Sequence, residues 1–406
     1  MANRQMHWKV GATQTRPLWT TVPDVSVVEA LSRPHLFPHG DNLTGELTVT
    51  FLAEGAFNKV YTVDVKSTSL VKSFVFRASL PVEPGDKVRN EAATMMYIKQ
   101  HTKIPVPAVI AYDCSSENAL GFEWILMERI PGAQLSEIWP SLSDTAKSSI
   151  TREIGDYIVQ MRRNCVFHEI GGLYHDADRG FTIGPTISQF FFMGPRRQLI
   201  SRNRGPYEHD RDFARALVDV QIADIQFLNT IQSTDPIFDP DLFDDGPDIL
   251  HAMDELHSLI PLIFPKDETN ERFRTILQHP DLSLHNIMVD PTTLNITGLI
   301  DWECTNASPH WEHPYPQFLM GPEVEDEPPR VEHGDTDPLR NEQWDDWEKM
   351  HLRKVFDEVA GHLVEEPLAV LKREFMYHLG VAEYSQVMVT QWAKTAREQL
   401  AAFARE

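Results

Sequence analysis

Apolar and polar positions alternate over the segment from Leu47 to Glu128, which predicts a region rich in β-strands. The expected strands are Leu47 to Leu52, Val60 to Val65, Ser73 to Leu80, Val106 to Tyr112 and Gly121 to Met127. One helix interrupts them between Lys87 and Gln100, and its apolar side consists of Ala92, Met95, Met96 and Ile98. The turn signal Ile130-Pro131-Gly132 ends this region.

Helical periodicity dominates from Leu135 onward, with expected helices at Ser143 to Arg163, Arg211 to Ile231 and Leu352 to Leu363. A strand hairpin is inserted there, formed by Asn286 to Asp290 and Ile296 to Asp301. The pattern therefore predicts an α+β fold class, in which a small β lobe precedes a large α lobe. We expect residues 1–40 to be an irregular N-terminal extension, 41–130 the N-terminal lobe and 131–406 the helical lobe.

Composition excludes some classes of partner. The formal net charge of -23 argues against nucleic acid, whose phosphates would be repelled, and no apolar stretch is long enough to span a membrane. The three cysteines are scattered and lack zinc-ligand spacings, which is typical of a reducing compartment. We expect a cytoplasmic protein. A mitochondrial location is the alternative, because the first 23 residues contain Arg4, Lys9 and Arg16 and no acidic residue. No pattern indicates an oligomeric state.

The segment from His279 to Asn286 and the acid at Asp301 carry the strongest chemical signal. They form the pattern H-x-D-x-x-x-x-N, and the hairpin then leads to Asp301-Trp302-Glu303. Phosphoryl transfer requires one carboxylate that orients the acceptor hydroxyl, and an amide oxygen and a second carboxylate that hold Mg²⁺ on the nucleotide phosphates. The hairpin would return Asp301 beside Asn286. His279 or Asp281 alone would be an ordinary loop residue, but the whole combination indicates phosphoryl transfer.

This segment resembles the catalytic loop of the aminoglycoside phosphotransferase and choline kinase-like family, in the form of its fungal altered-inheritance-of-mitochondria branch. The other matching segments are Glu54 to Tyr61, Phe76 to Pro81, Ile104 to Pro107 and Met127 to Gly132. The resemblance implies a protein-kinase-like two-lobed fold, with a small antiparallel β lobe containing one helix and a large, mostly α-helical lobe. It also implies ATP and Mg²⁺ as cofactors and a small molecule as the acceptor substrate.

The resemblance places the nucleotide site on the small lobe. Gly55, with Asn58 behind it, matches the family's reduced nucleotide-covering loop, whose backbone amides approach phosphate oxygens closely. Arg77 matches the strand lysine that holds the phosphates in kinases, and Glu91 matches the helix glutamate that steadies it. Two alternatives stay open: Arg77 and Glu91 form only a structural ion pair, or Lys72 takes the place of Arg77.

The strand that ends at Ile130 matches the hinge between the lobes. By resemblance, the backbone around Glu128 and Ile130 would hydrogen-bond adenine. The alternative interpretation is a plain connector, since an apolar strand that runs into a Pro-Gly turn can serve that purpose alone.

The roles in the catalytic loop follow from the same resemblance. Asp281 would orient an acceptor hydroxyl (or amine) for in-line attack on the γ-phosphate, and His279 would brace the loop. Asn286 and Asp301 would hold Mg²⁺. The rival hypothesis is a nucleotide-binding pseudokinase or scaffold, suggested by the arginine in place of lysine and the single glycine. Transfer of AMP is a third option, and the acceptor is not identified.

A basic run interrupts the acidic chain, formed by Arg196, Arg197, Arg202 and Arg204. We expect it to be a solvated loop, with contact to a phosphate or an acidic partner as the alternative.

Overall fold

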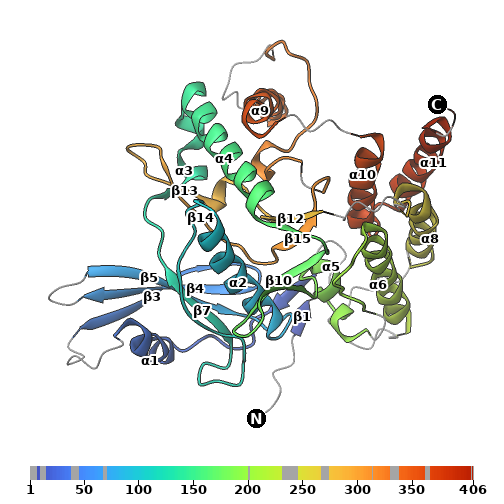
Figure 1. Ribbon diagram of the computed structural model, residues 1–406. Helices are drawn as coiled ribbons and strands as arrows, with labels where there is room; N and C mark the ends of the chain where they lie inside the picture. The colour runs from blue at the N-terminus through green and yellow to red at the C-terminus, as the bar shows by residue number, and fades with distance from the viewer. Residues whose placement is uncertain are drawn as a thin grey trace.

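A computed structural model describes residues 7–9, 15–37, 45–66, 71–199, 202–230, 246–266, 274–312, 314–329, 338–361, 366–403 and 405. They form a small lobe built on an antiparallel sheet and a larger lobe dominated by helices (Figure 1). The predicted α+β fold class, with its protein-kinase-like division into two lobes, is confirmed. Within the described ranges, none of the helices combines the length and apolar composition needed to cross a bilayer.

The small-lobe sheet has the strand order β3-β4-β5-β7-β6, with antiparallel neighbours throughout. Its strands are β3 (Glu46–Glu54), β4 (Asn58–Lys66), β5 (Val71–Ser79), β6 (Val109–Asp113) and β7 (Glu123–Glu128). Helix α2 (Asp86–His101) follows β5 and packs against β6 and β7. Its N-cap, Gly85, has a positive φ of 79°, and its N–H donates to Glu123 Oε1 at 2.7 Å.

Alternation along β5 decides which residues meet α2. Phe74, Phe76 and Ala78 point to one face of the sheet and share a core with Val28 of helix α1 (Val25–Leu36). The intervening residues point to the opposite face, where Val75 packs against the core that contains α2. Because successive strand residues face opposite sides, Arg77 falls on the α2 side of the sheet.

The prediction of an irregular N-terminal extension is wrong for the described part of residues 1–40. This part contains a two-stranded sheet, β1 (His7–Lys9) with β2 (Arg16–Leu18), and the helix α1. Asp24 caps α1 by accepting a hydrogen bond from the Ser26 N–H at 2.8 Å, and the side chain of Val28 is completely buried. Two of the prolines that suggested irregularity lie within these elements, Pro17 in β2 and Pro34 in the last turn of α1.

The large lobe contributes to two apolar cores, and it shares the first of them with α2 and β7 of the small lobe. One lies where α4 (Asp144–Asn164) packs against α9 (Pro338–Ala360), and the other lies among α6 (Asp210–Thr230), α8 (Gly246–Ile263), α10 (Pro367–Val381) and α11 (Gln386–Phe403) (Figure 1). The short helices are α3 (Leu135–Ile138) and α5 (Gln189–Phe192), with 3₁₀ turns at Trp139–Ser141, Arg196–Gln198, Leu284–Asn286 and Gln317–Leu319.

The large lobe also contains more β-structure than the single hairpin that the sequence predicts. A five-stranded sheet has the order β11-β10-β15-β12-β9, and a three-stranded sheet has the order β14-β13-β8. The bounds are β8 (Ala133–Gln134), β9 (Val166–Phe167), β10 (Gly171–Asp176), β11 (Gly180–Gly184), β12 (Thr275–Gln278), β13 (Ile287–Val289), β14 (Ile296–Leu299) and β15 (Asn306–Pro309). The hairpin β13–β14 is the predicted one.

The junction between the lobes depends on Gly132. It has a φ of 112°, and a Cβ there would lie 2.2 Å from the carbonyl oxygen of Val289 on β13. Only glycine fits so close to a backbone atom. The Pro-Gly turn therefore places the end of the small lobe directly against the β13–β14 hairpin.

Candidate active site

The loop after β12 is held by its own backbone and by the hairpin that follows. The Asn286 N–H donates to the carbonyl of Ser283 at 3.0 Å, and the Ile300 N–H donates to the carbonyl of Asn286 at 2.9 Å. Leu282 anchors the loop in the core that the two lobes share, with 2% of its surface exposed. These contacts bring the two ends of the loop and the end of β14 together.

His279 is a buried, neutral brace between these segments. Its Nδ1 accepts the Asp281 N–H at 3.2 Å, so the ring hydrogen lies on Nε2, which donates to the Ile300 carbonyl at 2.9 Å. The ring packs on Trp302 with centroids 4.5 Å apart. Burial lowers the pKa of His279 to about 4. A ring with both nitrogens engaged in this way orients the loop instead of exchanging protons with a substrate.

This pKa predicts a pH-dependent stability. Because the folded-state pKa lies below the ordinary value of 6.5, the contribution of neutral His279 is complete above that pH and is lost as the pH falls toward 4. We expect this group to lower the free energy of unfolding by about 2 kcal/mol between pH 7 and pH 5. Urea unfolding at both pH values should show that His279→Gln loses this part of the pH dependence.

The exposed neighbour His285 provides the control, and His285→Gln should keep the pH dependence of the wild-type protein. A His279→Gln variant that loses stability between pH 7 and pH 5 as steeply as the wild type would contradict the assignment.

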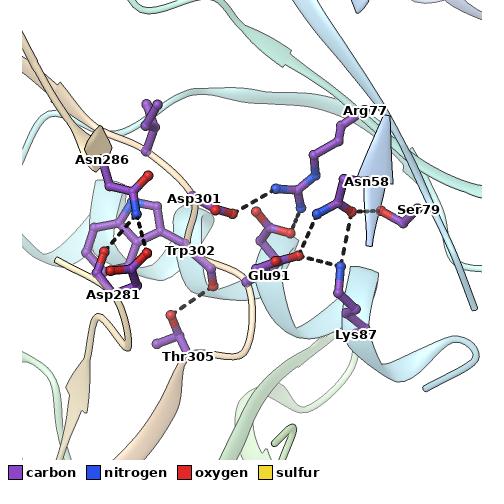
Figure 2. Close-up of polar contacts among 12 residues, drawn as sticks. Asn58, Arg77, Ser79, Lys87, Glu91, Asp281, Asn286, Asp301, Trp302 and Thr305 are labelled. Carbon is purple, nitrogen blue, oxygen red and sulfur yellow. Dashed lines mark hydrogen bonds and ion pairs between the residues drawn. The ribbon is translucent and has the colours of Figure 1, made fainter. Parts of the chain in front are cut away.

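Asn286 links directly to Asp281. Its Nδ2 donates to the Asp281 carbonyl at 2.8 Å and to Asp281 Oδ2 at 3.0 Å, so the amide oxygen lies on the other side (Figure 2). The carboxylate of Asp281 is exposed to solvent. An oxygen of Asn286 and a carboxylate of Asp281 are thus presented from one loop.

Asp301 follows β14 in a left-handed backbone conformation with a φ of 62°. Its Oδ1 accepts from Arg77 Nη1 at 3.2 Å, and its side chain is 40% exposed. Burial of the Asp301 carboxyl group and the negative charge of Glu303 raise the pKa of Asp301, whereas the positive charge of Arg77 lowers it. The Asp301 carboxylate therefore lies close to the charges of Glu303 and Arg77. This position suits a metal ligand better than the position of an isolated surface carboxylate would.

Arg77 joins Asp301 to the small lobe. It is only 5% exposed, and its Nη2 is paired with Glu91 of α2 while its Nη1 reaches Asp301 (Figure 2). The structure thus contains the Arg77–Glu91 ion pair. Both sequence interpretations require this pair: one in which Arg77 also holds the phosphates, and one in which the pair is only structural. The alternative cation, Lys72, lies elsewhere on the surface and pairs with Glu128 at 3.2 Å.

Gly55 and Asn58 occupy the turn between β3 and β4. The Gly55 N–H donates to the Asn58 carbonyl at 2.9 Å. A Cβ at Gly55 would meet no protein atom within 4 Å, so packing within the protein does not require glycine there. The side chain of Asn58 turns inward and bonds to protein groups: its Nδ2 donates to Glu303 and its Oδ1 accepts from Ser79. By resemblance, Asn58 was expected to contact the nucleotide. In the structure its side chain bonds to Glu303 and Ser79 instead.

The predicted hinge lies at the end of β7. The Glu128 N–H donates to the Ala108 carbonyl at 2.9 Å, so a contact of Glu128 with adenine would have to use its carbonyl oxygen. Ile130 packs over Gly298 of β14, where an added Cβ would lie 2.8 Å from Ile130 Cγ2. The segment is therefore fixed against both lobes.

Two charged residues of this site, Lys87 and Glu303, were not predicted from the sequence. Lys87 of α2 is completely buried and pairs with Glu303 at 2.5 Å. Burial alone would raise the pKa of Glu303, but Lys87 and Arg77 outweigh it, so the pKa of Glu303 is lowered. The signal was the spacing of Lys87 and Glu91, which places both on one face of the predicted helix.

The basic run is not a solvated loop, and that prediction is wrong for three of its four residues. Arg196 is paired with Asp224 at 2.6 Å and with Glu383 inside the large lobe. Arg202 and Arg204 pair with Glu83, which is 2% exposed and lies just before α2. The last two arginines therefore fasten the large lobe to the beginning of the helix that carries Lys87 and Glu91.

The two-lobed fold and the composition of this site are those of a phosphotransferase. The sequence profile of the Phosphotransferase enzyme family (APH) matches residues 48–312, and the chain belongs to this family. A subtelomeric hrmA-associated cluster protein of Aspergillus fumigatus is 28% identical over 322 residues, which cover 66% of this chain and 59% of that protein. Altered inheritance of mitochondria protein 9 of Komagataella phaffii is 28% identical over 333 residues, covering 70% of this chain and 51% of that protein. The chain thus spans little more than half the length of these relatives.

Solved structures with a similar arrangement include an ethanolamine kinase of Plasmodium vivax, with a TM-score of 0.45, 12% identity, and coverage of 92% of this chain and 84% of that one. A choline kinase of Cryptosporidium parvum has a TM-score of 0.43 and 15% identity, covering 94% of this chain and 96% of that one. The predicted membership of the family and the distant similarity to the fungal altered-inheritance-of-mitochondria proteins are confirmed.

Proposed function

We propose that the protein is a Mg²⁺-dependent kinase that transfers the γ-phosphoryl group of ATP to a hydroxyl group (or an amine) of a small molecule. One observation carries the proposal: Asp281, Asn286 and Asp301 form one linked unit, and Arg77 connects that unit to the small lobe. Phosphoryl transfer depends mainly on positioning and on charge stabilisation, and these residues can supply both.

The residues present fit a magnesium ion. The amide oxygen of Asn286 faces away from Asp281, and the Asp301 carboxylate is partly exposed, so both could act as oxygen ligands. In the parts of the chain that the structure describes, His, Cys, Asp and Glu do not assemble into a metal-binding group of three. Mg²⁺ commonly takes only one or two protein ligands and completes its shell with phosphates and water. Bound there, it would neutralise charge on the nucleotide phosphates.

Asp281 would hold the acceptor. Its exposed carboxylate would accept a hydrogen bond from the acceptor hydroxyl and receive its proton as the new P–O bond forms and the bond to ADP breaks. Asn286 fixes the carboxylate from one side through Oδ2, which leaves Oδ1 for the substrate. His279 keeps the backbone of Asp281 in place through the contact at 3.2 Å.

Gly55 would cover the phosphates with its backbone. This role predicts that a substitution there changes the affinity for ATP without changing the stability of the protein. Gly55→Ala should leave the melting temperature nearly unchanged, because its Cβ meets no protein atom, but should raise the KM for ATP several-fold. As a contrast, Gly180→Ala should lose about 1 kcal/mol of stability because Gly180 has a φ of 74°, with no change in KM. Equal KM values for wild type and Gly55→Ala would contradict the loop assignment.

A nucleotide-binding scaffold without transfer activity is the second candidate. One observation favours it: the guanidinium of Arg77 is already paired with two carboxylates, which limits what it can offer to a phosphate. Transfer activity and nucleotide binding therefore have to be measured separately.

The test begins with melting temperatures with and without Mg²⁺-ATP, followed by a screen of a metabolite library for Mg²⁺-dependent consumption of ATP. Asp281→Asn serves as the negative control, and Asp178→Asn, an equivalent change in an exposed turn, serves as the matched variant. Consumption of ATP with one acceptor that stops only in Asp281→Asn supports the kinase. Binding without consumption across the library favours the scaffold, and absence of binding contradicts both.

A further inference from the structure

Glu303 lies two residues after Asp301, but its carboxylate contacts the small lobe instead of the catalytic loop. Its Oε2 accepts from Asn58 Nδ2 at 2.7 Å and is paired with Lys87 Nζ at 2.5 Å. These partners belong to β4 and α2, so a residue of the large-lobe segment is held entirely by small-lobe side chains.

The partners of Glu303 also bind each other. Asn58 Oδ1 accepts from Lys87 Nζ at 3.1 Å and from Ser79 Oγ at 2.7 Å (Figure 2). Lys87 and Ser79 are completely buried and Asn58 is 7% exposed. Removing one member would leave a buried charge or polar group without its partner, which makes such a closed network costly to break at any single point.

The network lies beside a segment whose backbone has to be held in place. Asp301 and Cys304 both have positive φ values, 62° and 59°, which residues other than glycine adopt only when their surroundings enforce it. On the large-lobe side the indole of Trp302 donates to the Leu299 carbonyl at 2.9 Å. On the small-lobe side, Glu303 is the residue of this segment that is fastened by an ion pair to α2.

Helix α2 thus meets this segment at two successive turns. Lys87 contacts Glu303 directly, and Glu91, four residues later, contacts Asp301 through Arg77. Asn58 extends the connection to the turn of Gly55, because its carbonyl accepts the Gly55 N–H at 2.9 Å. One carboxylate therefore links the proposed phosphate-covering turn, α2 and the backbone of the proposed metal ligand.

We propose that Glu303 is a positioning residue and not a metal ligand: held by Lys87 and Asn58, it sets Asp301 relative to the Gly55 turn, and Lys87 is its required counter-ion. This inference rests on the proposed binding of Mg²⁺-ATP. It predicts that Lys87, whose amino group contacts Glu303 and Asn58, affects Mg²⁺ and nucleotide affinity as strongly as Glu303 does.

A double-mutant cycle tests this with Lys87→Met, Glu303→Gln and the double variant. The measurements are the dissociation constant for Mg²⁺-ATP, the Mg²⁺ concentration that gives half-maximal binding at fixed ATP, and the melting temperature. Each single variant should weaken Mg²⁺-ATP binding by about 10- to 100-fold. The double variant should be no weaker than the worse single variant, because both substitutions remove the same interaction.

Lys147→Met is the matched control for the loss of a buried ion pair. Lys147 pairs with Glu348 at 2.5 Å, with side chains 5% and 18% exposed, against 0% and 19% for Lys87 and Glu303. It lies within the large lobe, between α4 and α9. Lys147→Met should lower the melting temperature as Lys87→Met does, while its affinity for Mg²⁺-ATP stays at the wild-type value.

Other outcomes overturn the inference. If Glu303→Gln raises the Mg²⁺ requirement and Lys87→Met does not, Glu303 is itself a metal ligand. If the Lys87 and Glu303 variants lose only stability, as Lys147→Met does, or if their effects on affinity multiply, there is no positioning pair. Failure of the proposed function looks different: the wild-type protein itself would not bind Mg²⁺-ATP, and the inference would fall with it. Binding without transfer would leave this test intact.

Discussion

Asp281→Asn is expected to lower kcat by about 10²- to 10⁴-fold, the usual value of a positioned general base, while the fold and the affinity for Mg²⁺-ATP stay close to wild type. The physical reason is that asparagine keeps the shape and can still accept the hydrogen bond from Asn286 at 3.0 Å, but cannot receive the proton of the acceptor. Steady-state kinetics with the identified acceptor measure the effect, and equilibrium binding of Mg²⁺-ATP provides the second readout.

The contacts around Asp281 show that the substitution should not disturb the fold, so a loss of turnover can be assigned to the missing carboxylate. Its backbone N–H donates to His279 and its side chain is exposed, so no buried charge is left unpaired by the change. Turnover of Asp281→Asn at the wild-type rate would remove Asp281 from the chemistry and leave the site without its acceptor-binding carboxylate.

Asp301→Asn is expected to have the second large effect, and on binding as well as turnover. Of the two proposed metal ligands, Asn286 is neutral and Asp301 carries the charge, so its removal should raise the Mg²⁺ requirement by at least about tenfold and lower kcat. Asparagine is the appropriate substitution because it tolerates the left-handed conformation at a φ of 62°, whereas alanine would add strain of about 1 kcal/mol. Titration of Mg²⁺ at fixed ATP measures the effect.

Asp301→Asn and Asp301→Ala therefore separate charge from strain. We expect similar losses of Mg²⁺ affinity in both, but a lower melting temperature only in the alanine variant. An unchanged Mg²⁺ requirement in Asp301→Asn would show that the metal is held elsewhere. Removal of Mg²⁺ by a chelator should abolish turnover of the wild-type protein, whereas Asp301→Asn should regain activity at high Mg²⁺ concentrations.

The catalytic loop was predictable because its information is local. His279, Asp281 and Asn286 lie within one tight loop, and the short β13–β14 hairpin brings Asp301 back to the same place, so spacing alone defines the geometry. The pairing of Arg77 with Glu91 came from the resemblance to a known family, and the structure contains that contact.

The roles of Asn58, Lys87 and Glu303 could not be predicted in this way. The resemblance of the Gly55 turn to a nucleotide-covering loop suggests that Asn58 faces a phosphate, but its amide donates to Glu303, which belongs to the other lobe. Lys87 carries a charge near the start of an amphipathic helix, where solvent exposure is the ordinary expectation, yet it is completely buried. A charge can be buried only beside its counter-ion, and that counter-ion is distant in sequence.

The amino-acid sequence by itself determined the strand-rich and helix-rich halves, the spacing within the loop from His279 to Asn286 and the membership of the family, because periodicity and short spacings act over a few residues. Only the tertiary structure decided how the lobes are joined, through the Lys87–Glu303 pair and the partners of Arg202 and Arg204. It also decided that α1 packs on the small-lobe sheet. Ion pairs and apolar contacts between distant segments depend on which faces meet after folding, and no local pattern records that.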